Sequence, residues 1–101
     1  MKFVINGNTW TIKEMSRYEF ESTEPGTLAE TCYIPQEIHL SNDSKAKKAD
    51  LVHELCHVWL YEYGHMQNEK CKFHFEQVCQ IVACSNDFIN SVVELYFKEK
   101  K

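Results

Sequence analysis

The sequence changes its periodicity near residue 42, and this change limits the possible folds more than any other feature. Before it, short runs rich in β-branched and aromatic residues are separated by turn-forming dipeptides, as is typical of strands. After it, apolar residues recur at steps of three and four, as is typical of helices. Strands followed by helices, rather than alternating with them, indicate an α+β fold. Because 101 residues have room for one hydrophobic core, we predict a single domain over residues 1–101.

The composition argues against several classes of protein. The chain is 44% hydrophobic and has a net charge of −4, which disfavours both disorder and direct binding of nucleic acid. No run has the length and apolarity of a signal peptide or a membrane span. The cysteines form no C-x-x-C pair, which indicates reduced thiols and a cytoplasmic location. We expect most of the five to be small core residues: Cys32, Cys56, Cys71, Cys79 and Cys84.

The N-terminal third predicts a small antiparallel or mixed sheet. Phe3–Ile5 and Thr9–Ile12 flank Asn6-Gly7, a dipeptide that accepts the positive φ angles of a tight hairpin turn. Leu28–Ile34 and Glu37–Ser41 predict two further strands, or one strand interrupted at the proline between them. This hairpin and the later strands would form one layer of the domain.

The run Glu37–Ser41 also suggests how a peptide could bind. Its alternation sends Ile38 and Leu40 to one face and His39 to the other. We interpret His39 as a surface histidine of the strand, and we expect the run to be an exposed edge. An extended peptide could pair with such an edge by strand addition.

A helix is predicted from Lys45 to Tyr63, after the possible capping residues 42–44 and before Gly64. Its histidines, His53 and His57, project away from the apolar stripe, whereas Cys56 projects toward it. The stripe that should face the core contains Leu51, Val52, Leu55, Trp59 and Tyr63.

This helix contains the motif H-E-x-x-H as His53, Glu54 and His57. Side chains four residues apart on a helix are neighbours, so two imidazoles can converge on one Zn²⁺ ion. Glu54 would flank the metal and act as general base toward a water whose pKa zinc lowers to about 7. The motif also arises by chance in chains of this composition, and the alternative is an ordinary helix with three polar residues.

A second helical region is predicted from Phe73 to the end, with a break at Ser85-Asn86. It offers two candidates for a third zinc ligand, Glu76 and His74, which point about 200° apart on a helix. We favour Glu76, because it shares a face with small and uncharged residues that would pack close to the motif helix; the alternative is a solvated first-turn acid. Gln80 could accept a hydrogen bond from a ligand histidine.

The chain after Pro25 resembles the small ImmA/IrrE-like metallopeptidases of phages and other mobile elements. The resemblance rests on the segments EIHLS, ADLVHELCHVWLYEYG and FHFEQVCQIVACSNDFINSVVELYF. It implies a minimal zincin-like domain in which His53 and His57 bind Zn²⁺, Glu54 is catalytic and Glu76 is the third metal ligand. It also implies a protein or peptide substrate, such as a repressor-type regulatory protein.

The predicted function is therefore zinc-dependent hydrolysis of peptide bonds. One alternative is a non-catalytic interaction module that zinc stabilises. Another is a SprT-like protease, a group that shares the H-E-x-C-H form and uses a histidine as third ligand, which would be His74. The paired cysteines of a zinc ribbon, typical of that group, are missing from this sequence.

Overall fold

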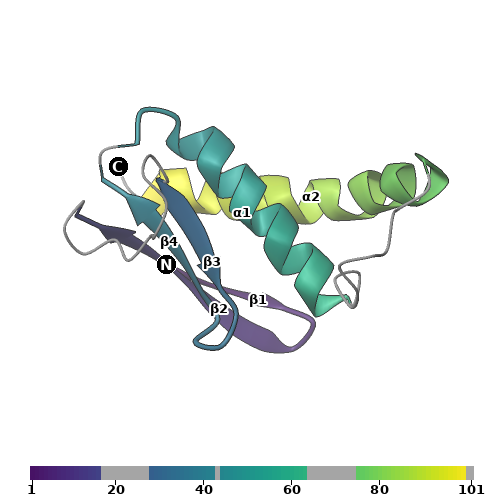
Figure 1. The fold of residues 1–101 in the computed structure, drawn as a ribbon, viewed down its shortest axis with the longest axis horizontal. Coiled ribbons are helices and arrows are strands. Elements are labelled where there is room, and N and C mark those ends of the chain that lie inside the picture. The colour runs from purple at the N-terminus through teal and green to yellow at the C-terminus, as the bar shows by residue number, and fades with distance from the viewer. Residues whose placement is uncertain (17–27, 43, 64–74, 100–101) are drawn as a thin grey trace.

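The computed structural model describes residues 1–16, 28–42, 44–63 and 75–99, which form a sheet covered on one face by two helices (Figure 1). This arrangement confirms the α+β class and the order of strands before helices. The elements are β1 (Lys2–Ile5), β2 (Asn8–Met15), β3 (Ala29–Cys32), β4 (Glu37–Ser41), α1 (Lys47–Glu62) and α2 (Phe75–Glu99).

The predicted hairpin at Asn6-Gly7 is confirmed. Asn6 has a φ of 50° and Gly7 a φ of 77°, so both central residues of the turn are in the left-handed region. A two-residue turn of this kind matches the twist of antiparallel strands. It therefore pairs Ile5 with Asn8 and Phe3 with Trp10, which puts Phe3, Ile5 and Trp10 on the covered face of the sheet.

The strand order is β1-β2-β4-β3, and the sheet is mixed because β2 and β4 run parallel while both outer pairs are antiparallel. The expectation that Glu37–Ser41 forms an exposed edge is wrong. This strand, β4, pairs with β2 on one side and with β3 on the other, so its backbone groups are used in both directions. Strand β3 is the edge on this side of the sheet.

The hydrophobic core lies between the sheet and the two helices. Alternate residues of each strand meet one face of α1 and the second half of α2, and this burial drives the packing of the two layers. The core contains Phe3, Ile5, Trp10, Ile12, Ile38, Leu40, Leu51, Leu55, Val58, Ile89, Val92, Val93 and Tyr96.

Helix α1 is slightly shorter than predicted. The face that it buries is not centred on the predicted apolar stripe. Leu51, Leu55 and Val58 are fully buried, whereas Tyr63 is 45% exposed at the end of the helix. Cys56 is exposed, so the prediction that it points to the core is wrong. With about 100° of rotation per residue, a face centred on the three buried residues leaves Cys56 outside it.

The start of α1 also differs from the expectation of a side-chain cap. Ala46 is the N-cap residue and offers no side-chain hydrogen bond. Ser44 lies just before it, where its Oγ accepts a hydrogen bond of 3.3 Å from the Ala46 N–H and donates one to the Asp50 carboxylate. The polar residues before the helix therefore stabilise its first turn from outside the cap position.

Helix α2 is continuous, so the predicted break at Ser85-Asn86 is wrong. Ser85 is only 5% exposed, and the next turn packs Phe88 and Ile89 against the rest of the domain, which favours continuing the helix. The earlier turns extend beyond α1 (Figure 1), and Val78 and Val82 are 44% and 58% exposed there. Neither described helix is long and apolar enough to cross a membrane.

The expectation that most cysteines are core residues fails for the four that lie in the described part of the chain. Cys56, Cys79 and Cys84 are exposed, and Cys32 is half-buried. The core instead selects larger aliphatic and aromatic side chains, which remove more apolar area from water per residue. Cys71 lies outside the described residues.

Glu62 connects the turn of the hairpin to the end of α1. Its carboxylate accepts hydrogen bonds of 2.7 Å from Trp10 Nε1 and from Asn8 Nδ2, and its carbonyl accepts one of 3.0 Å from Asn6 Nδ2. Trp10 has no exposed surface, so its indole N–H depends on this acceptor.

We predict that Glu62→Ala lowers the free energy of unfolding by about 1–3 kcal/mol, because it leaves the buried indole N–H without an acceptor. Urea denaturation followed by tryptophan fluorescence measures this change. Glu62→Gln, which keeps an acceptor oxygen, should lose less, and Glu94→Ala on the exposed side of α2 should change stability little. Equal effects of Glu62→Ala and Glu94→Ala would contradict the assigned role.

Candidate metal centre

The structure brings the two motif histidines together on α1. The distance between His53 Nε2 and His57 Nε2 is 3.2 Å, and the ring centroids are 4.9 Å apart. Two imidazoles on one tetrahedral Zn²⁺ ion, with Zn–N bonds of about 2.0–2.1 Å, hold their nitrogens about 3.3 Å apart. The pair therefore has the spacing that a shared zinc ion requires.

The histidines lie on the side of α1 away from the core, as predicted. His53 is exposed and His57 is half-buried. His57 Nδ1 is buried and has no hydrogen-bond partner among the residues that the structure describes. A zinc-bound histidine usually donates this second N–H to a carboxylate or carbonyl, so this supporting acceptor is missing within the described ranges.

Glu54, next to His53 on α1, contacts the sheet. It is only 7% exposed, and its Oε1 accepts a hydrogen bond of 2.8 Å from Thr31 Oγ1 on β3. The same hydroxyl also lies 3.4 Å from the Glu54 backbone carbonyl. A buried carboxylate is costly without a donor, so Thr31 fixes the side chain at the boundary between α1 and the edge strand.

Tyr33, just after β3, lies within the electrostatic reach of Glu54. Burial raises the pKa of its phenol, and the charges of Glu54 and Tyr61 raise it further. Its ring stacks on Tyr61 with centroids 4.8 Å apart and meets Trp10 edge-on at 6.5 Å. Tyr33 therefore remains a protonated hydrogen-bond donor near Glu54, a feature that sequence reasoning missed because it requires the β3–α1 packing.

The proposed third ligand, Glu76, lies in the first turn of α2, and its side-chain position is outside what the structure describes. Phe88 packs on Trp59 of α1, and Glu76 precedes it by twelve residues, or about 18 Å of helix. His74 also lies outside the described residues. Neither candidate is placed beside the histidine pair.

The face of α2 that was expected to approach α1 closely is exposed. Cys79, Gln80 and Ala83 all lie on the solvent side of the helix. Gln80 is also not the hydrogen-bond partner of His57 Nδ1, which has none within the described ranges. The predicted support of a ligand histidine by Gln80 is therefore not found for His57, because this part of α2 extends past α1 instead of packing along it.

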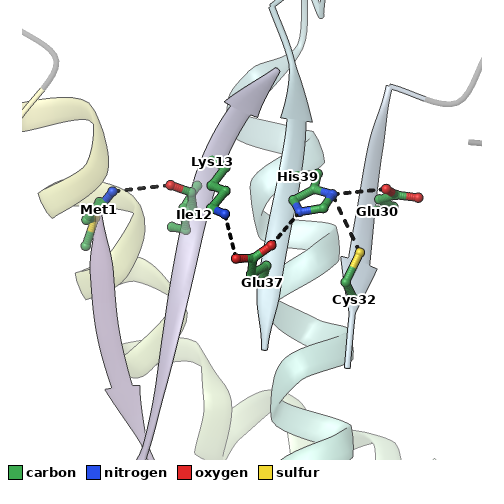
Figure 2. Close-up of polar contacts among 7 residues, drawn as sticks. All are labelled: Met1, Ile12, Lys13, Glu30, Cys32, Glu37 and His39. Atoms are coloured by element: carbon green, nitrogen blue, oxygen red, sulfur yellow. Dashed lines mark hydrogen bonds and ion pairs between the residues drawn. The ribbon is translucent and has the colours of Figure 1, made fainter. Parts of the chain in front are cut away.

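A second group of possible metal ligands lies on the outer face of the sheet, away from both helices (Figure 2). Glu30, Cys32 and His39 each offer one ligand atom, and these atoms lie within 4.8 Å of one another. His39 was expected to be a surface histidine of its strand and Cys32 a core residue. The sequence offered one signal for this group: Glu30 and Cys32 are two residues apart, which puts both side chains on one face of a strand.

Comparison with known proteins adds no assignment to this geometry. No protein-family model, no curated protein and no solved structure matches the chain.

We predict that His53→Ala and His57→Ala each reduce zinc binding at this centre, because one imidazole alone leaves too few ligands for a tight site. Isothermal titration of the metal-stripped variants with Zn²⁺, compared with wild type, measures the loss. Asn90→Ala, on the exposed surface of α2, serves as the control and should bind zinc as wild type does. Unchanged binding in both histidine variants would exclude this pair as ligands.

Proposed function

We propose that this chain is a zinc-dependent hydrolase of peptide bonds with a minimal zincin-like fold. His53 and His57 hold the metal, Glu76 supplies the third ligand, and Glu54 is the general base. The observation that carries the proposal is the 3.2 Å separation of the two Nε2 atoms on a helix whose intervening acid, Glu54, is held in a defined position. The resemblance to ImmA/IrrE-like peptidases supports the same assignment.

Each residue around the metal has its own role in the proposed hydrolysis. Zinc, when bound, lowers the pKa of a coordinated water and polarises the carbonyl of the substrate. Glu54 accepts the proton of the attacking water and passes it to the leaving amine. Thr31 keeps one oxygen of Glu54 occupied at 2.8 Å, so the orientation of the carboxylate does not depend on substrate. Tyr33 offers a phenolic O–H near the same carboxylate.

The edge strand β3 is the natural place for a peptide substrate. Its outer side faces no other described strand, and Thr31 connects this strand directly to Glu54. An extended peptide paired with β3 would run past α1 beside the catalytic acid. A flexible segment of a repressor-type regulatory protein has the required extended form.

One observation favours a second function, a zinc-stabilised interaction module without turnover. Glu54 is buried and bonded to β3, which is also the behaviour of an acid that holds two elements together. In that case Glu54 contributes to stability and not to hydrolysis. A SprT-like protease with His74 as third ligand is the other alternative.

We predict that Glu54→Gln lowers peptide hydrolysis by about 10² to 10⁴-fold while zinc stays bound, because the amide cannot accept the proton. A mixed library of unstructured peptides incubated with the zinc-loaded protein and read by mass spectrometry measures the activity. Glu62→Gln, at the far end of α1, is the control for loss of a carboxylate elsewhere on the same helix. Hydrolysis by Glu54→Gln at the wild-type rate would end the mechanism, and the absence of cleavage by wild type would favour the interaction module.

The third ligand is tested by comparing Glu76→Ala with His74→Ala. We expect Glu76→Ala to lose zinc affinity and hydrolysis together, and His74→Ala to retain both, because a catalytic zinc site has three protein ligands. Zinc titration of both variants provides the measurement. Loss of affinity in His74→Ala alone would assign the third ligand to His74 and favour the SprT-like alternative.

A further inference from the structure

The outer face of the sheet gathers three side chains of metal-binding type. In the antiparallel pair of β3 and β4, Glu30 lies opposite His39 and Cys32 lies opposite Glu37. All four side chains leave the sheet on the side opposite to the core, because their neighbours Thr31 and Ile38 face the helices. Figure 2 shows Glu30 and Cys32 converging on the imidazole of His39.

The two distances from His39 Nδ1 to the other ligand atoms are close to those of a tetrahedral metal centre. Cys32 Sγ lies 3.6 Å from His39 Nδ1, and Glu30 Oε1 lies 3.1 Å from the same nitrogen. A Zn²⁺ ion with Zn–S of about 2.3 Å and Zn–N and Zn–O of about 2.0–2.1 Å would hold these pairs about 3.5 Å and 3.4 Å apart.

The other nitrogen of His39 has the support that metal-binding histidines commonly have. Its Nε2 lies 2.9 Å from Glu37 Oε1, and Glu37 Oε2 forms a 2.7 Å ion pair with Lys13 on β2. Glu37 is therefore paired with Lys13 through one carboxylate oxygen and contacts His39 through the other. An Nε2–H that donates to Glu37 leaves the lone pair of Nδ1 directed at Cys32 and Glu30.

From this geometry we infer that Glu30, Cys32 and His39 form a second metal site, on the outer face of the sheet, for a divalent ion of the Zn²⁺ type. One thiolate, one imidazole and one carboxylate are a ligand set that zinc accepts and that Mg²⁺ and Ca²⁺ do not favour. The fourth position is filled by water. The site binds the edge strand β3 to its neighbour β4.

Binding of the ion changes the contacts and charges of the Glu30–Cys32–His39 group. Without metal, the two ring nitrogens of His39 lie 3.1 Å from the Glu30 carboxylate and 2.9 Å from the Glu37 carboxylate. With metal, the Cys32 thiol releases a proton to solvent as the S–metal bond forms, and the lone pair of His39 Nδ1 forms the N–metal bond. The two positive charges of the ion then balance the thiolate and the Glu30 carboxylate, and Glu37 keeps Lys13 as its partner.

This site is separate from the histidine pair of α1. Thr31 points to Glu54 on the covered face of β3, whereas Glu30 and Cys32 point to the outer face of the same strand. The two centres therefore share no ligand. The second site is testable whether or not the proposed peptidase activity is found.

The first experiment uses the wild-type protein and follows each thiol. Metal-stripped protein is alkylated with iodoacetamide with and without excess Zn²⁺, and the modified cysteines are identified by peptide mass mapping. We expect zinc to slow the labelling of Cys32 but not that of the exposed Cys84, because a coordinated thiolate is a poor nucleophile. The same protection should persist in a His53→Ala/His57→Ala variant. Labelling of Cys32 that zinc leaves unchanged would overturn the site.

The second experiment uses Co²⁺, whose bond to a thiolate gives a near-ultraviolet charge-transfer band. Cys32→Ser should lose this band at the outer site, and Cys84→Ser should keep it. Glu37→Gln retains all three ligands and should weaken Zn²⁺ binding at this site by about 10- to 100-fold, as loss of a supporting carboxylate does. A Co²⁺ spectrum identical in wild type and Cys32→Ser would overturn the site and leave His39 only as a polar bridge between Glu30 and Glu37.

Discussion

Burial of one face of the sheet against both helices is the constraint on which the rest of the structure depends. Leu51, Leu55 and Val58 of α1 are fully buried over Ile38 and Leu40 of β4. Because this contact occupies one side of α1 and one side of the sheet, polar side chains must leave on the remaining sides. The histidine pair therefore lies on the side of α1 away from the core. The Glu30–Cys32–His39 group lies on the outer face of the sheet.

Strand β3 connects the two groups, because consecutive residues of a strand point to opposite faces. Thr31 turns inward and donates to the carboxylate of Glu54, while Glu30 and Cys32 turn outward toward His39. An ion at the outer group would hold this edge strand against β4. Because Thr31 is part of the same strand, an ion on the outer face would also affect the position of Glu54. The backbone of β3 would connect the two sites.

Local patterns predicted much of the fold, and the errors occurred where packing decides. The turn at Asn6-Gly7 and the helix of the H-E-x-x-H motif depend on residues close in sequence, and both are found. The break at Ser85-Asn86 was wrong because the packing of the following turn favours one continuous helix. The edge assignment for β4 was wrong because pairing with β2 joins segments more than twenty residues apart.

The sequence by itself determined that His53 and His57 are neighbours, since a four-residue spacing on a helix brings two side chains together whatever surrounds the helix. Only the tertiary structure decided that Glu54 is buried beside Thr31, and that Glu30, Cys32 and His39 meet. The physical reason is strand register: a shift of one residue between β3 and β4 would send these side chains to the other face, and no local pattern specifies that register.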